Sequence, residues 1–178
     1  MTISKFGVEL KRLTVDKIEL VRAWRNDPKI SRSMFFAQHI TAEMQQKWFE
    51  SIDNEHNFYF LIYYHGKAVG LIHTSEIDNA KKTAFSGLFI YDESYWGTDV
   101  PVRASLAMLD FFFAENSIET FFAKTKKDNK AAILYNEMLG FEVESEIEKD
   151  TGLLLKLTKE NYYRASARLQ KIAERVKG

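Results

Sequence analysis

The stretch NKAAILYNEMLGFE, residues 129–142, is the segment that decides the fold. It predicts a helix that ends at Gly140, since glycine is the preferred residue just beyond a helix C-terminus, and a strand that follows directly. Three polar residues of this helix, Asn129, Tyr135 and Asn136, have two possible roles. They are either ordinary surface residues or one wall of a small-molecule site.

Hydrophobic periodicity places further elements on both sides of this helix. An antiparallel meander precedes it, including a hairpin that turns at His65-Gly66, and strand–helix–strand units complete the chain. We therefore expect one mixed α/β (α+β) domain over residues 1–178, with a helical C-terminal extension at about residues 160–178. The predicted strands are residues 8–14, 58–64, 67–77, 83–91, 120–125, 141–148 and 153–158.

Two helices are predicted in the N-terminal half. The first takes Asp16 as its N-cap, and the second opens at Thr41. Their apolar faces are predicted to consist of Ile18, Val21 and Trp24 in the first helix and of Met44, Trp48 and Ile52 in the second.

The composition excludes several classes of protein. With 178 residues and 46% hydrophobic content, the chain is large enough to bury a core. Its 25 basic and 25 acidic residues give no net field that attracts nucleic acid or an anionic membrane. The absence of cysteine excludes a disulfide framework and fits a cytoplasmic location. We expect no signal peptide, no membrane span and no metal, since the four histidines lack ligand spacing.

A possible anion site lies in YWGTDVPVRASLAMLDFFF, residues 95–113. A glycine-containing loop leads into a helix near Pro101, and proline suits the first helical position. The amides of Val102 and Arg103 are then expected to be unpaired at the positive end of the helix dipole, with the Arg103 side chain in the same turn. Most such helix ends bind nothing, so the motif alone does not decide the matter.

The two segments together resemble the GNAT superfamily of N-acetyltransferases. Residues 95–113 align without gaps on the family wording Y-W-G-K-G-Y-A-T-E-A-L, and residues 128–142 align on D-N-K-A-S-I-x-x-Y-E-K-L-G-F. The resemblance implies a mostly antiparallel sheet that splays between the fourth and fifth predicted strands, with helices on both faces. It also implies acetyl-CoA as co-substrate and direct acetyl transfer to an amine. The coenzyme contacts that it implies are Leu88, Phe89, Ile90, Gly97, Thr98, Val100, Val102, Arg103 and Asn129.

The chain departs from the family wording in two places. Asp99 and Pro101 occupy small-residue positions of the loop, which adds a negative charge near a diphosphate and removes one amide. The family's tyrosine, which assists the departing thiolate, aligns with Asn136, while Tyr135 stands one residue earlier, about 100° around the helix. Asn136 is therefore the candidate for that role, and Tyr135 is either a second candidate or a packed aromatic residue.

The acceptor side is expected in the N-terminal half. Residues 23–41 resemble the start of nucleotide-sugar N-acetyltransferases of the pseudaminic acid pathway, which implies an amino group on a UDP-linked sugar as acceptor. The alternative is that the aromatic residues in this segment belong to the core. The substrate-binding candidates are Arg25, Met34, Phe35, His39 and Trp48.

The general base has several candidates, of which Glu76 is preferred. His73 and Asp78 lie in or just after the same strand, and His39 lies before the second helix. Strand alternation predicts that Glu76 shares a face with Ile72 and not with His73. The chain is thus expected to be an N-acetyltransferase for a small-molecule amine, with a homodimer as one option for its assembly. The alternatives are an acetyltransferase for protein N-termini or ribosomal proteins and a weakly active, coenzyme-binding regulator.

Overall fold

The computed structural model describes residues 1–36, 38–115, 117–147 and 151–175. Its eight-stranded sheet has the order β1-β2-β3-β4-β5-β6-β8-β7, and every neighbouring pair is antiparallel except β5–β6. The strands are β1 (Thr2–Lys5), β2 (Val8–Arg12), β3 (Phe58–Tyr64), β4 (Lys67–Asp78), β5 (Thr83–Ile90), β6 (Thr120–Lys126), β7 (Glu142–Ile147) and β8 (Gly152–Thr158). The predicted mixed, mostly antiparallel sheet is confirmed.

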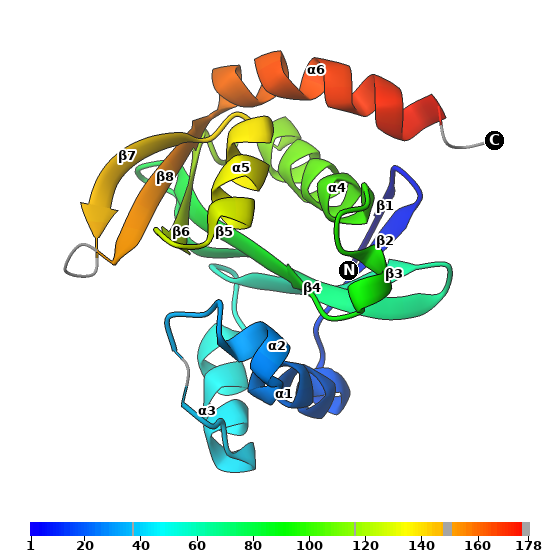
Figure 1. Cartoon of the computed structure of the whole chain (residues 1–178), viewed down its shortest axis with the longest axis vertical. Coiled ribbons are helices and arrows are strands. Elements are labelled where there is room, and N and C mark those ends of the chain that lie inside the picture. Colours follow the sequence, from blue (N-terminus) through cyan, green and yellow to red (C-terminus); the bar gives the residue numbers. More distant parts are fainter. Residues whose placement is uncertain (37, 116, 148–150, 176–178) are drawn as a thin grey trace.

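Helices cover both faces of the sheet (Figure 1). One face carries α1 (Ile18–Asn26), α2 (Pro28–Ser31) and α3 (Ala42–Ile52), and the other carries α4 (Val100–Ala114), α5 (Lys130–Met138) and α6 (Lys159–Arg175). Short 3-10 turns stand at Val15–Lys17 and Glu93–Tyr95. No helix among these described segments is long and apolar enough to cross a membrane. Residue 148 of a predicted strand and residues 176–178 of the predicted extension lie outside the described residues.

Turn chemistry sets the register of two hairpins. His65 and Gly66 both have positive φ, 48° and 76°, which is the backbone of a two-residue type I′ turn between β3 and β4. Phe6 and Gly7, at 54° and 77°, turn β1 back onto β2 in the same way. Strand β1 was not predicted, and it moves the splayed pair from the fourth and fifth strands to β5 and β6.

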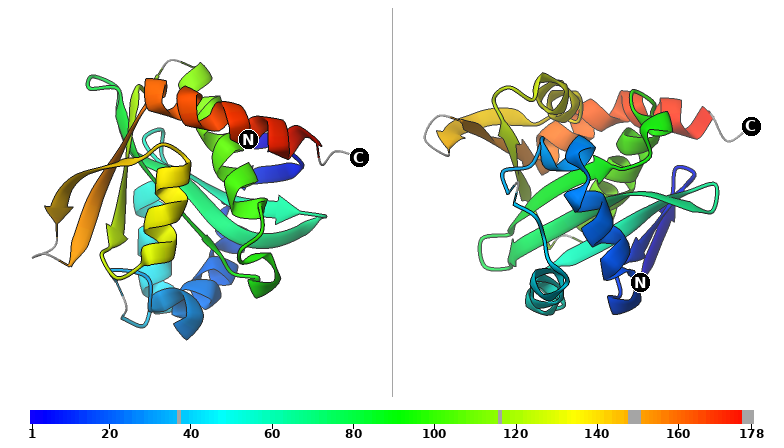
Figure 2. Two further views of the ribbon diagram at one scale, coloured as in Figure 1. Left: turned by 45° about the horizontal axis from the view of Figure 1, so that its top comes forward. Right: turned by 60° about the horizontal axis from the view of Figure 1, so that its bottom comes forward.

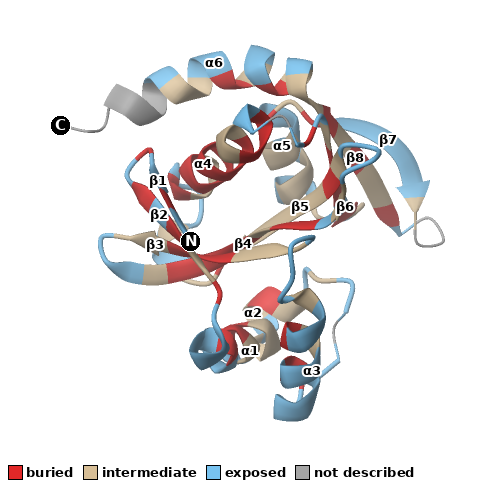
Figure 3. Ribbon diagram, turned by 180° about the vertical axis from the view of Figure 1, so that it is seen from behind, coloured by how far each residue is buried: buried red, intermediate tan, exposed pale blue. Residues whose placement is uncertain are grey.

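Two apolar layers hold the helices to the sheet. Figure 3 shows buried segments in the helices and in the strands of the sheet. The larger layer lies under α4, whose side chains Leu106, Met108 and Phe113 are fully buried. Helix α6 is fixed to α4 by Tyr162, whose hydroxyl donates to the Asp110 carboxylate. Lys5 of β1 pairs with the same carboxylate, so Asp110 joins three elements.

The smaller layer joins α1 and α3 to the other face of the sheet. The predicted core positions Ile18, Val21 and Trp24 are buried as expected. Asp16 is not the N-cap: it lies inside the 3-10 turn, and α1 begins at Ile18. The predicted stripe of α3 is also wrong at Met44, which is 39% exposed. Gln45 and Phe49 form the buried face, and Trp48 and Ile52 pack at its edge.

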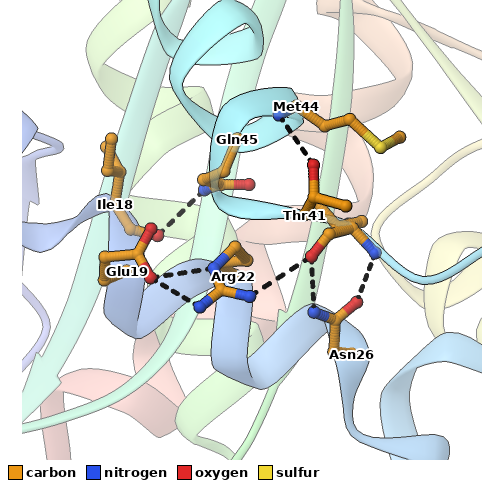
Figure 4. Close-up of polar contacts among 8 residues, drawn as sticks. Ile18, Glu19, Arg22, Asn26, Thr41, Met44 and Gln45 are labelled. Carbon is orange, nitrogen blue, oxygen red and sulfur yellow. Dashed lines mark hydrogen bonds and ion pairs between the residues drawn. The ribbon is translucent and has the colours of Figure 1, made fainter.

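A polar clamp connects α1 to the start of α3 (Figure 4). The Asn26 side chain donates to the Ile40 carbonyl (2.9 Å) and accepts from the Ile40 amide (2.8 Å). Gln45 Nε2 donates to the Ile18 carbonyl at 2.9 Å, and Thr41 caps α3 by accepting from the Met44 amide. Asn26, beside the candidate residue Arg25, therefore has a structural role.

Candidate functional site

A gap opens in the sheet between β5 and β6. The two strands pair in parallel from Thr83 with Thr120 to Phe85 with Phe122, and the pairing ends there. Residues 85–89 are half-exposed, although β5 is an interior strand of a sheet covered on both faces. The predicted splay of residues 86–90 from residues 120–125 is therefore present in the structure.

Backbone groups of β5 face this gap at alternate residues. The Tyr91 amide donates to Val69 of β4, and the Phe89 carbonyl is turned toward Gly70 of β4, where an added Cβ would lie 2.3 Å from it. Because strand residues direct their backbone groups alternately to the two sides, those of Leu88 and Ile90 face the gap. Phe89 is thus not placed for the backbone contact expected of it. The Ile90 carbonyl accepts from the Trp96 indole (2.9 Å), so this carbonyl is already occupied.

The loop before α4 is held by its own hydrogen bonds. Gly97 has a φ of 73°, a value that favours glycine, and Thr98 Oγ1 donates to the Tyr95 carbonyl at 2.8 Å. The Val100 amide reaches Thr98 Oγ1 at 3.3 Å. The Arg103 amide donates to the Asp99 carbonyl at 2.9 Å, so the expectation that this amide is unpaired is wrong.

The Arg103 side chain lies inside the protein and is 2% exposed. Its Nε and Nη2 donate to Asp99 Oδ2 at 2.9 and 2.7 Å, and its Nη1 donates to the Phe6 carbonyl at 2.9 Å. The guanidinium is therefore committed to these partners and does not extend into the loop to meet a diphosphate. The ion pair with Arg103 also offsets the negative charge of Asp99, which the sequence places next to the expected diphosphate site.

Two asparagines belong to the α5 segment, which follows β6: Asn129 is the N-cap of α5, and Asn136 lies in its last turns. Asn129 Oδ1 caps the helix by accepting from the Ala132 amide (3.1 Å), which leaves its two Nδ2 hydrogens for other partners. Asn136 Nδ2 donates to the Ala132 carbonyl at 2.8 Å, so one of its two hydrogens is already used. Both side chains are half-buried and retain donor capacity.

Tyr135 points away from Asn136, onto the first turns of α4. Its hydroxyl donates to the Pro101 carbonyl at 2.9 Å and lies 2.7 Å from Ser105 Oγ. Burial raises the pKa of Tyr135 well above its usual value, so the phenol keeps its proton at physiological pH. The ring packs against the main core. This geometry is that of a packed, hydrogen-bonded residue.

Polar and aromatic side chains meet on the opposite face of β5, below α1 and α3. The Arg25 guanidinium lies 5.3 Å from the Trp48 ring, and Trp48 meets Tyr59 edge-on at 5.1 Å. Tyr59 stacks on His73 at 4.8 Å, and His73 is paired with Gly87 of β5. Of these, the sequence singled out Arg25, Trp48 and His73. Tyr59 and Gly87 were missed, although strand alternation places Tyr59 and His73 on one face once the β3–β4 hairpin register is known.

The other predicted acceptor residues lie further from this cluster. Phe35 is 42% exposed and packs against Gly152 of β8, where an added Cβ would lie 2.9 Å from its ring. Met34 is half-buried, and His39 is exposed. Lys126 of β6 donates to the Arg32 carbonyl at 3.0 Å, which ties this loop to the end of the sheet beyond the gap.

Glu76 does not follow the alternation predicted for it. It stands in a bulge of β4 between Ser75 and Asp78, with a φ of 52°, and its amide donates to Asn57 Oδ1 at 3.1 Å. Its charge acts weakly on Tyr59: burial raises the pKa of Tyr59 most, Ser75 and Arg25 oppose that rise, and Glu76 adds a smaller one. The carboxylate is exposed beside the polar cluster. No group of three or more metal-ligating side chains occurs in the described part of the chain.

A scan of protein-family models decides the family. The model described as an acetyltransferase (GNAT) domain matches residues 8–142. The chain belongs to this family. This GNAT is accordingly an N-acetyltransferase that uses acetyl-CoA.

Individual relatives are distant. The spermidine N(1)-acetyltransferase of Escherichia coli K12 is 24% identical over 145 residues, which cover 81% of this chain and 77% of that protein. A spermidine N-acetyltransferase from Vibrio cholerae, solved with coenzyme A and spermine, superposes with a TM-score of 0.79 at 14% identity over 88% of this chain and 98% of that chain. The RimL ribosomal alpha-N-protein acetyltransferase gives a TM-score of 0.76 at 17% identity over 89% and 98% of the two chains. These structural likenesses establish the fold of the GNAT domain.

The residues around the gap fit an acetyl-CoA thioester and its pantetheine arm. Half-exposed strand residues, the Leu88 backbone groups and the Asn129 amide offer donors and acceptors for an extended chain that runs between β5 and β6. The loop at Gly97–Val100 and the start of α4 would hold the diphosphate through backbone groups, without the Arg103 side chain. Acetyl-CoA supplies the activated acetyl group, and the protein orients it.

Proposed function

We propose that this GNAT acetylates the amino group of a nucleotide-linked amino sugar. The observation that carries the proposal is Arg25. Among the described residues its guanidinium contacts the Trp48 ring and has no carboxylate at ion-pair distance, and burial lowers its pKa. A half-buried guanidinium without a counter-ion is stabilised by an anionic ligand, and a diphosphate is such a ligand.

Two lysines of β6 support the same reading. Lys124 Nζ lies 5.0 Å from the Phe85 ring at the start of the gap, and Lys126 donates only to a backbone carbonyl. Neither has an ion-pair partner within the described ranges. The acceptor face therefore presents cations from α1 and β6, with Glu76 as an exposed carboxylate nearby.

The same charges oppose a polyamine acceptor. Two like charges 4 Å apart near a protein surface repel by about 4 kcal/mol at an effective dielectric constant of 20. A cationic amine would meet that repulsion at Arg25 and Lys124, whereas a nucleotide sugar brings phosphates to them. Within this proposal Leu88, Ile90, Gly97, Thr98, Val100, Val102 and Asn129 contact the coenzyme, and Asn136 assists the departing thiolate.

Thiol release from acetyl-CoA with three acceptors tests the proposal. We expect turnover with a UDP-linked amino sugar and little with spermidine or an N-terminal peptide. Arg25→Met should raise the KM for the sugar nucleotide at least tenfold and leave calorimetric binding of acetyl-CoA unchanged. Lys47→Met is the matched control, because Lys47 is exposed and paired with Glu43.

The other outcomes would replace the proposal. Turnover of the peptide alone would assign the chain to protein N-terminal acetylation, and turnover of spermidine alone would assign it to polyamine acetylation. Tight binding of acetyl-CoA without turnover of any amine would favour a regulatory role.

A further inference from the structure

We propose that His73 helps to select the acceptor substrate. Its Nε2, above Gly87, donates a hydrogen bond to an oxygen beside the amine that is acetylated. The inference rests on the proposed acetyl transfer and adds a residue that determines specificity. It concerns the face of β5 opposite α4, from which an acceptor can approach the gap.

The position of the imidazole follows from a missing side chain. His73 of β4 is paired with Gly87 of β5, and an added Cβ on Gly87 would lie only 2.7 Å from His73 Nε2. The ring therefore lies across β5 in the space that any other residue at position 87 would fill. Gly87 stands two residues beyond Phe85, where the pairing with β6 ends. The leading edge of the imidazole thus stands at the border of the gap.

The surroundings of the ring select one protonation state. Burial and the charge of Arg25 lower the pKa of His73 to about 4, so the imidazole is neutral at physiological pH. Tyr59 stacks on the ring with 4.8 Å between the ring centroids. A neutral imidazole has one N–H donor and one acceptor nitrogen.

The tautomer follows from the contacts of Nδ1, which is buried without a hydrogen-bond partner among the described atoms. Orphaned buried N–H groups are rarer than under-satisfied acceptors, so the proton is assigned to Nε2. His73 then presents an N–H above Gly87. Such a donor matches a hydroxyl or ring oxygen of an amino sugar, and a polyamine has no oxygen to meet it.

This role does not make His73 a base. Acetyl transfer forms an N–C bond and breaks a C–S bond, and the proton that the amine loses is the one that the thiol gains. A neutral imidazole with so low a pKa is a poor acceptor for an ammonium proton. Any extra proton of an ammonium acceptor must therefore be removed by another group, for which Glu76 remains the candidate, and His73 orients the amine.

Two amide substitutions separate the nitrogens of the ring. In His73→Gln the amide N–H stands near the place of Nε2, whereas in His73→Asn it stands near the place of Nδ1. We expect His73→Asn to raise the acceptor KM by about 10- to 100-fold, as for a buried polar group that is left without its partner, and His73→Gln to stay within about threefold of wild type. Calorimetric binding of acetyl-CoA should be unchanged in both variants.

Two further measurements make the test independent of folding. Gly87→Ala should reproduce the KM effect of His73→Asn, since its methyl group displaces the imidazole, and circular dichroism checks the fold. In ¹⁵N-labelled protein the imidazole signals of His73, assigned by comparison with His73→Gln, should show the Nε2–H tautomer and shift when the acceptor is added.

The outcomes distinguish this inference from the proposed function. If UDP-amino sugars are turned over but His73→Asn has the wild-type KM, His73 does not read the acceptor. The proposed function then stands. If no amino sugar is used, the same variants are measured with amines that differ only in a neighbouring hydroxyl. Equal KM values for such a pair would overturn the role of His73.

Discussion

Tyr135→Phe tests whether the only tyrosine of α5 is a catalytic acid or a structural tie. The substitution removes a hydroxyl that bonds the Pro101 carbonyl at 2.9 Å and Ser105 Oγ at 2.7 Å. Each such bond contributes about 0.5–1.5 kcal/mol net, and Ser105, which is 4% exposed, would lose a partner in a buried place. We expect a loss of about 1–3 kcal/mol in the free energy of unfolding, measured by urea denaturation.

The kinetic result separates the two roles. If Tyr135 only ties α5 to the start of α4, its loss should raise the KM for acetyl-CoA several-fold and change kcat less than threefold. Because burial raises the pKa of Tyr135, the pH–rate profile of the wild type should show no break from this group up to pH ~10.

Ser105→Ala is the matched control, because it removes one partner of the same hydroxyl. The double variant should lose less stability than the two single losses added together, since both act on one contact. A hundredfold fall in kcat with unchanged KM and unchanged stability would refute this reasoning and restore Tyr135 as the acid.

Three other predictions concern stability. Asp99→Ala should lower the free energy of unfolding by about 2 kcal/mol by leaving the buried Arg103 guanidinium without its carboxylate, and Asp99→Asn by less; chemical denaturation compares them. Wild-type protein should lose up to about 3 kcal/mol in its free energy of unfolding as pH falls from 6.5 to 4, because the unfolded state protonates His73 at a higher pH than the folded state does. His73→Gln should make the free energy of unfolding less dependent on pH over this range, and an unchanged dependence would show that the pKa of His73 is not lowered. Asn26→Ala should cost about 2 kcal/mol and speed hydrogen exchange of the Ile40 amide, whereas unchanged exchange would contradict the clamp.

Local chemistry made much of the fold predictable from the sequence. Gly140, with a φ of 98°, ends α5 where the sequence placed its end, and an added Cβ there would lie 2.8 Å from the Asn161 carbonyl. The His65-Gly66 turn and the alternation of β3 and β4 likewise depend on neighbouring residues only. Strand alternation and turn residues of this kind depend on a few neighbouring residues, so they can be predicted from a single sequence.

Long-range contacts account for the errors. The position of the Arg103 side chain depends on a hydrogen bond to the carbonyl of Phe6, which lies 97 residues away in the sequence. No local sequence pattern predicts that bond. The prediction for Glu76 was wrong because a bulge interrupts the alternation of β4. A bulge adds a single residue to one strand, and the alternation of apolar and polar residues in the sequence does not reveal it. The proposed contact between His73 and the acceptor substrate depends on Gly87, which becomes a neighbour of His73 only when β4 and β5 pair.

The two departures from the family wording, namely the loop residues Asp99 and Pro101 and the shifted tyrosine, meet at the first turn of α4. Asp99 brings a charge that Arg103 offsets, and Pro101 lacks an amide but offers the carbonyl that Tyr135 binds. A tyrosine at position 136 would point about 100° away from that carbonyl, so the shift of the tyrosine by one residue is what allows the tie. Restoring the family tyrosine alone, as Asn136→Tyr with Tyr135→Asn, should therefore release α5 from α4 and weaken coenzyme binding. Coenzyme binding as tight as in the wild type would show that the three positions vary independently.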